Sequence, residues 1–233
     1  MMMDIFSTFD PFNYYSFYKF SPLFWTMSLL PLILLSSNYW MTPPPSFWLP
    51  QSILSMAYDQ VKRTFSIHLK SLASVLCPLF LLIIVVNLIG MIPYTLSASS
   101  HLLFSVTLAL PLWFSLILSG FMSKPKTATA NFLPSGAPAW LAPALIIIET
   151  ISVMVRPITL SVRLAANMSA GHIVLGLMGM YCAAAFASSP SSMISLLLIQ
   201  SGYTIFEFGI CCIQAYIFFL LLTLYADEHP PLK

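Results

Sequence analysis

The sequence predicts an all-α membrane protein built from simple transmembrane spans, a surface amphipathic helix and a long tilted helical hairpin. Of its 233 residues, 59% are hydrophobic and only 7% are charged, and the mean hydropathy is +0.90. Soluble domains usually carry roughly 25% charged residues, so this composition excludes a large soluble domain. The net charge of +2 is too small to indicate a nucleic-acid partner. We therefore expect residues 1–233 to form a single integral membrane domain surrounded by lipid.

Three apolar segments have the length of a single crossing. They cover residues 20–37, 72–93 and 101–122, and roughly 20 apolar residues suffice to span a bilayer as a helix. Residues 50–70 differ, because apolar side chains alternate there with charged and amide side chains. This pattern predicts an amphipathic helix that lies on the membrane surface.

The two apolar segments that follow are too long for simple crossings. They cover residues 143–187 and 193–226. At ~1.5 Å per residue the first would reach about 65 Å, against a hydrocarbon core of about 30 Å. Both are expected to tilt strongly, kink or lie nearly in the membrane plane, with Pro157 as the kink. The serine- and proline-rich residues 188–192 are the expected turn of this hairpin.

The basic residues predict the orientation in the membrane. If the three shorter segments each cross once, five basic residues fall on one side, and the positive-inside rule makes it the inner side. The N-terminus and the turn at 188–192 then lie outside, and the C-terminus lies inside. The five residues are Lys62, Arg63, Lys70, Lys124 and Lys126, the last two within a predicted loop at 123–142.

Arg163 is the most unusual residue of the hairpin. A guanidinium stays charged in proteins, and at the centre of a bilayer it costs at least ~2.5–3.5 kcal/mol. Handling of protons or anions is the work that best fits such a charge. At about 100° per residue, Glu149, Arg156 and Asn167 lie within about 40° of Arg163, whereas His172 points the opposite way. The small residues that follow the arginine predict that another helix approaches it closely.

Polar residues also recur at multiples of seven positions along the second helix of the hairpin, at Gln200, Glu207, Gln214 and Glu228, which places them on a shared face. Folding the hairpin at its turn brings residues that are equally far from the turn to the same depth. We therefore expect three polar layers, with two aqueous routes that stop at the middle one. From the outer to the inner side, the layers contain His172 with Glu207, Arg163 with Gln214, and Glu149 with Glu228 and Asp227.

Each residue of these layers also has a structural interpretation, as a buried ion-pair partner, a buried hydrogen-bonding group or a solvated helix end. Outside the layers, Arg156 is expected to be structural or to extend to the membrane interface. Asn87 and His101 are left open between structural and functional roles. The four cysteines lack the spacing of a disulfide framework or a zinc site. No metal and no cofactor is expected.

Three other classes of protein compete with proton handling. A secondary transporter or channel would use Arg163 to bind an anionic substrate, but such folds show inverted repeats, and this sequence has no internal repeat. An intramembrane enzyme would carry a catalytic motif, and no Walker-type loop, HExxH or nucleophile elbow occurs. A purely structural membrane subunit would not need three layered polar pairs.

Five motifs resemble subunit a of the F-type ATP synthases. The most specific is RLAANMSAGH, from Arg163 to His172. The combination of His172 with Glu207 is similar to the mitochondrial form, and the resemblance covers residues 72–226. The four shorter motifs are NLIGMIP at 87–93, FLPSG at 132–136, IETIS at 148–152 and IQAYIF at 213–218.

The resemblance implies a proton-translocating stator subunit that couples proton flow to ring rotation and ATP synthesis. Arg163 would be the essential arginine that faces the carboxylates of the c-ring, flanked by Asn167 and Gln214. The half-channel residues that the resemblance implies are His172 and Glu207 on the intermembrane-space side, and Glu149, Glu228 and Asp227 on the matrix side.

The resemblance also implies partners and a location. We expect c-ring subunits, peripheral-stalk subunits and other Fo subunits as partners, and neither nucleotide nor nucleic acid. The subunit would catalyse nothing alone, as the part of a proton-transporting ATP synthase that binds no nucleotide. It would lie in the mitochondrial inner membrane, with its N-terminus toward the intermembrane space and its C-terminus toward the matrix. Protons are expected as the transported ion, rather than sodium ions.

Overall fold

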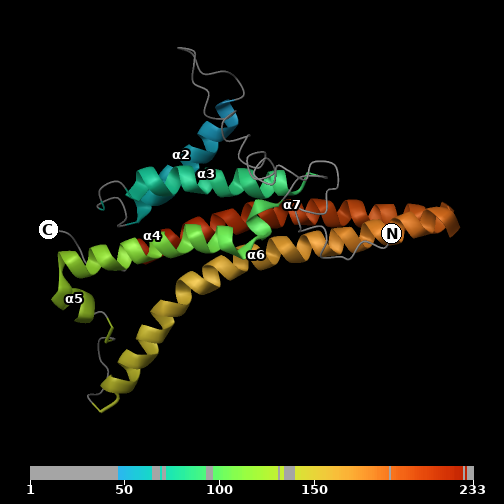
Figure 1. Cartoon of the computed structure of the whole chain (residues 1–233). Helices are drawn as coiled ribbons and strands as arrows, with labels where there is room; N and C mark the ends of the chain where they lie inside the picture. The colour runs from blue at the N-terminus through green and yellow to red at the C-terminus, as the bar shows by residue number, and fades with distance from the viewer. Residues whose placement is uncertain are drawn as a thin grey trace, which may run out of the picture.

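In the computed structural model, every secondary-structure element of the described residues is a helix (Figure 1). The structure describes residues 47–64, 69, 72–92, 97–130, 132–133, 140–188, 190–227 and 229. The helices are α2 (Trp48–Arg63), α3 (Leu72–Gly90), α4 (Leu102–Ser123), α5 (Pro125–Ala130), α6 (Ala142–Ser188) and α7 (Pro190–Asp227), with a 3-10 helix η5 at Ala98–Ser100.

The predicted fold class, an all-α polytopic membrane protein, is confirmed. Within the described part of the chain, α3, α4, α6 and α7 are long and apolar enough to cross a membrane. α3 and α4 occupy the segments predicted as single crossings at 72–93 and 101–122. The further crossing predicted at 20–37 lies outside the described residues.

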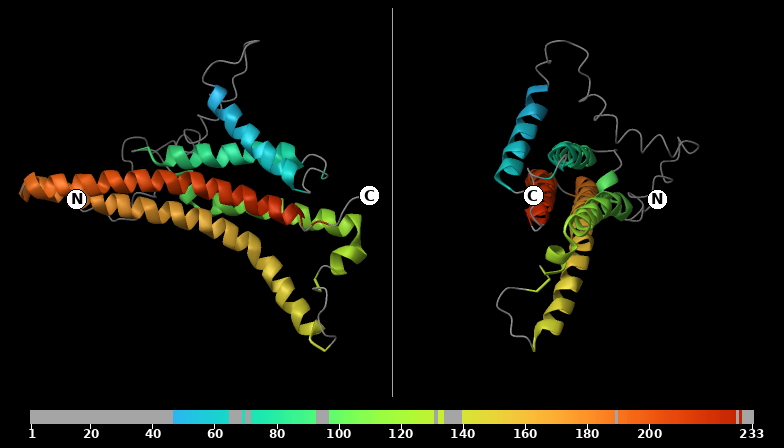
Figure 2. Two further views of the ribbon diagram at one scale, coloured as in Figure 1. Left: turned by 180° about the vertical axis from the view of Figure 1, so that it is seen from behind. Right: turned by 90° about the vertical axis from the view of Figure 1, so that its left-hand side faces the viewer.

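α6 and α7 form the predicted hairpin and run side by side over much of their length (Figures 1 and 2). The five-residue turn predicted at 188–192 is wrong, because α6 continues through Ser188 and α7 already begins at Pro190. Proline suits the first position of a helix, where a backbone N–H would have no partner within the helix. The serine-rich sequence is therefore mostly helical.

α6 is too long to cross a membrane along the normal. It has 47 residues, which as a straight helix would reach about 70 Å. Its first part diverges from α4 and α7, and the helix curves before it joins α7 (Figure 2, left). Pro157 lies inside the helix, as predicted for a kink. A proline removes one backbone hydrogen bond and its ring clashes with the carbonyl four residues earlier, so it bends the helix.

The remaining helices pack around the hairpin, with α3 on α7, α4 on α6, and α2 on α3. The buried core gathers side chains of α3 and α7, among them Leu76 and Ile83, each 1% exposed. The rings of Phe80 and Phe219 lie 5.1 Å apart, a separation typical of favourable aromatic pairs. Ala215 of α7 is fully buried in the same cluster, and its small side chain allows the neighbouring helices to approach α7 closely.

The amphipathic helix predicted at 50–70 is α2, and it ends earlier than predicted, at Arg63. Beyond this end Thr64 is extended, and its hydroxyl donates a hydrogen bond to the carbonyl of Val61 at 2.9 Å. Part of the apolar face of α2 packs on the core, and part of it is exposed. Val61 is buried against the core, whereas Met56 is 69% exposed.

The segment 123–142, predicted as a loop, contains the short helix α5. Pro125 is its first residue, a position that proline favours, so this proline starts a helix where a chain break was expected. The other proline and glycine residues that predicted the loop, at 134–138, lie outside the described residues.

We predict that Ala215→Leu destabilises the protein by roughly 1–3 kcal/mol, because added methylene groups in a packed core displace neighbouring side chains and backbone. Ala183 of α6 is exposed and provides the matched control. Thermal unfolding of the detergent-solubilised protein should show a lower midpoint for Ala215→Leu and an unchanged midpoint for Ala183→Leu. Equal midpoints would contradict the close packing around Ala215.

Candidate functional site

Arg163 lies in an open groove of about 450 Å³ between α6 and α7. Its side chain is exposed, and among the described residues it forms no ion pair with a carboxylate. The groove is otherwise lined by aliphatic and small residues and by a few polar ones. The polar residues are Asn167, Tyr203, Glu207 and Gln214.

The middle polar layer brings Arg163 and Gln214 together as lining residues of the groove. Gln214 is 3% exposed, and its side-chain oxygen accepts a hydrogen bond of 2.9 Å from the amide nitrogen of Asn167. Asn167 follows Arg163 by about one helical turn. This bond therefore joins α6 to α7 at the depth of the arginine.

Glu207 of α7 lies in the same groove, with only 1% of its surface exposed. Its carboxylate packs directly against the backbone of Gly171, and a Cβ atom at that position would overlap the carboxylate. Gly171 must therefore lack a side chain for Glu207 to occupy this place. From the sequence, Gly171 was interpreted only as one of the small residues that admit another helix. Nothing in its spacing indicated contact with Glu207.

His172 follows Gly171 directly, and Gly171 contacts Glu207. His172 therefore lies at about the depth of Glu207, as predicted for the outer layer. The histidine is half-buried, and its side chain is not among those that line the groove with Arg163. This placement agrees with the helical phase, which directs His172 away from the face that carries Arg163.

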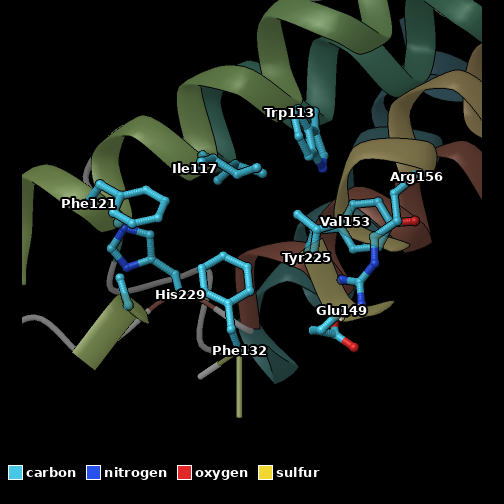
Figure 3. Close-up of a pocket in the computed structure, with 12 residues that line it drawn as sticks. Trp113, Ile117, Phe121, Phe132, Glu149, Val153, Arg156, Tyr225 and His229 are labelled. Carbon is cyan, nitrogen blue, oxygen red and sulfur yellow. Dashed lines mark hydrogen bonds and ion pairs between the residues drawn. The ribbon is translucent and has the colours of Figure 1, made fainter. Parts of the chain in front are cut away.

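The inner layer centres on Glu149, which forms an ion pair with Arg156 (Figure 3). The carboxylate oxygen Oε1 and the guanidinium Nη2 lie 3.5 Å apart. The guanidinium carbon of Arg156 lies 5.2 Å from the ring centre of Tyr225 on α7, within the range of a cation–π interaction. Asp227 is exposed at the end of α7, and Glu228 lies outside the described residues.

A second cavity, of about 130 Å³, lies at the inner end of the hairpin and is lined in part by Glu149, Arg156 and Tyr225. Its walls combine aromatic and aliphatic side chains, with Trp113 of α4 on one side and Phe132 on another (Figure 3). At its edge, the ring Nε2 of His229 lies 3.1 Å from the hydroxyl of Ser119. The aromatic partners come from distant parts of the chain, so the sequence did not indicate them.

Asn87 of α3 is a fully buried polar residue close to the groove. Its side-chain amide donates a hydrogen bond of 3.4 Å to the backbone carbonyl of Cys211, and the thiol of Cys211 lies 3.6 Å from the sulfur of Met168. The first contact joins α3 to α7, and the second joins α7 to α6. His101, the other residue left open, occupies the N-cap position of α4.

The groove combines a permanent cation with a buried carboxylate. An exposed guanidinium without an acidic partner can stabilise a carboxylate presented from outside the described chain. Glu207 can accept or donate a proton at the same groove. In the described part of the chain, no three metal-binding side chains lie together, and the four cysteines are free.

Comparison with known proteins identifies related chains. The family described as ATP synthase A chain matches residues 20–227. ATP synthase subunit a of Albinaria caerulea is 50% identical over 157 residues, which cover 67% of this chain and 72% of the relative. ATP synthase subunit a of Artemia franciscana is 37% identical over 235 aligned residues, covering 98% and 100%. ATP synthase F(0) complex subunit a of Osphranter robustus is 37% identical over 216 residues, covering 90% and 95%.

We predict that Gly171→Ala destabilises the pairing of α6 with α7 by roughly 1–3 kcal/mol, since the added methyl group must displace a packed side chain. Gly176, on the same helix, has open space where a Cβ would stand. Gly176→Ala should therefore be neutral or stabilising by up to about 1 kcal/mol, through helix propensity. Thermal unfolding of the two variants in detergent measures the difference, and a Gly171→Ala protein as stable as Gly176→Ala would contradict the contact with Glu207.

Proposed function

Because the chain belongs to the ATP synthase A chain family, we propose that its groove is the surface where protons are exchanged with a rotating ring of c subunits. The chain is a proton-translocating stator subunit of the Fo sector, in the mitochondrial inner membrane. The family does not favour a secondary transporter that binds an anionic substrate at Arg163.

The observation that carries the proposal is the exposed Arg163, which forms no ion pair within the described residues. A fixed cation favours the ionised form of a carboxylate that passes in front of it. It also repels a proton that would move directly from one side of the groove to the other. A proton must therefore travel around on the ring.

The outer half-channel is proposed to contain His172 and Glu207. Glu207 shares the groove with Arg163 and sits toward the hairpin turn, so it can deliver a proton to a ring carboxylate on the outer side of the arginine. His172 lies half-buried one residue beyond Gly171, on the face of α6 turned away from the groove. It is the candidate to receive protons from the intermembrane space.

The inner half-channel is proposed to contain Glu149, together with Glu228 or Asp227. Glu149 lies about 21 Å along α6 from Arg163, and its side chain is 39% exposed. It lies where α6 diverges from α7, so the two routes end at different lateral positions. This offset supports a path that requires the ring to turn.

The membrane potential supplies energy for this rotation. Each elementary charge that crosses yields ~2.3 kcal/mol per 100 mV. The proposed orientation places the N-terminus toward the intermembrane space and the C-terminus toward the matrix. c-ring and peripheral-stalk subunits are the proposed partners among the other ATP synthase subunits, and the chain itself is proposed to bind no nucleotide and catalyse no step alone.

We predict that Arg163→Lys abolishes ATP-driven proton pumping by the assembled enzyme. Lysine can lose its proton when desolvated, and it lacks the planar guanidinium fork. Acidification of inner-membrane vesicles, followed with a pH-sensitive dye, measures pumping. Arg63→Lys, at an exposed position of α2, is the matched control and should pump normally. Normal pumping by Arg163→Lys would rule out its role as the barrier between the half-channels.

We predict that Glu207→Gln slows proton transport at least about 100-fold, the scale of a lost proton-transfer group. Ser201→Ala is the control on the same helix, since Ser201 is exposed and its hydroxyl donates a hydrogen bond to the carbonyl of Leu198 three residues earlier. The ATP synthesis rate under an imposed proton gradient, divided by the amount of assembled enzyme, gives the comparison. A Glu207→Gln enzyme that works as well as Ser201→Ala would remove Glu207 from the outer route.

A further inference from the structure

Arg156 is a charged residue of α6 that the two half-channels do not use. Its side chain is only 23% exposed, in a helix long and apolar enough to lie in the membrane. Its guanidinium contacts the carboxylate of Glu149 at 3.5 Å and the ring of Tyr225 at 5.2 Å (Figure 3). Removing even part of a charge from water costs free energy, which indicates that this half-buried arginine has a role.

Comparison with Arg163 indicates what Arg156 does. The two arginines are seven residues apart, about 10.5 Å along the same helix, and they point in nearly the same direction. Arg163 is exposed and forms no ion pair within the described residues, whereas Arg156 is paired and stacked. The surroundings of Arg163 suit contact with an outside group. Those of Arg156 suit an internal contact with Glu149.

The cavity around this ion pair leaves the Glu149 carboxylate room to move unless a neighbouring group restricts it. Glu149 lies in the first part of α6, which diverges from α4 and α7 (Figure 1). The cavity walls include aromatic side chains such as Phe132 and aliphatic ones such as Val153. A free glutamate side chain would rotate among several rotamers. The ring of Tyr225, on α7, limits the movement of the Arg156 guanidinium. The guanidinium in turn limits the movement of the Glu149 carboxylate.

We propose that Arg156 is a positioning residue for proton transfer, which holds the Glu149 carboxylate at a fixed place in this cavity. The inference rests on the proposed function, in which Glu149 belongs to the inner half-channel. Arg156 does not carry the proton itself, because a guanidinium keeps its protons in proteins. Along α6 it lies between Glu149 and Arg163, seven residues from each.

The test compares ATP-driven proton pumping by the assembled ATP synthase in inner-membrane vesicles, normalised to the amount of intact complex. Arg156→Gln is expected to slow pumping about tenfold, as expected when a reacting group is misplaced by less than 1 Å. Arg156→Lys should recover part of the loss, since lysine keeps the charge without the planar fork. Lys126→Gln, at an exposed inner-side position of α5, controls for the removal of a positive charge and should pump normally.

A double-mutant cycle distinguishes positioning from a general structural role. If Arg156 acts through Glu149, adding Arg156→Gln to a Glu149→Gln enzyme causes no further loss. Equal losses from Arg156→Gln with and without Glu149 would overturn the inference and leave the inner half-channel intact. Normal pumping by Glu149→Gln alone would overturn the inner half-channel and this inference together. If Arg156→Gln prevents assembly, Arg156→Lys takes its place in the cycle, with the same expected and contradicting outcomes.

Discussion

The register in which α6 packs on α7 determines the depth of every polar side chain in the hairpin. A shift of one residue along either helix would turn its polar groups by about 100°, away from their partners. Contacts at three separate depths oppose such a shift, and each supports the other two. From the hairpin turn inward, they are Gly171 with Glu207, Asn167 with Gln214, and Arg156 with Tyr225.

The existence, length and relative depth of the long helices α3, α4, α6 and α7 could be predicted from the sequence, because they depend on local composition and on distance from the turn. The exact contacts could not, because they depend on which face of α7 meets α6. Gly171 shows the difference, since its depth was predictable but the carboxylate of Glu207 against it was not. The ion pair of Arg156 with Glu149 spans two turns, beyond the three or four residues over which helical neighbours normally interact.

Helix ends were also less predictable than helix cores, for a physical reason. Proline and serine both break helices in general, but proline at the first helical position is favourable. Pro125 and Pro190 both begin helices here, in segments where their presence predicted a loop or a turn. Asn87 illustrates another limit, since its hydrogen bond to Cys211 joins residues 124 positions apart, and no local pattern encodes that distance.

The unpaired charges of the groove have a consequence for biogenesis. Glu207 is buried and Arg163 is exposed, and neither forms an ion pair within the described residues. An ionised carboxylate that is buried without a partner costs several kcal/mol. A neighbouring subunit that supplies the missing contact binds the folded chain in preference to the unfolded one and stabilises it by mass action. Folding and assembly are thus thermodynamically linked in this chain. An unassembled copy of the chain is less stable than an assembled one. This difference in stability allows membrane quality control to distinguish the two.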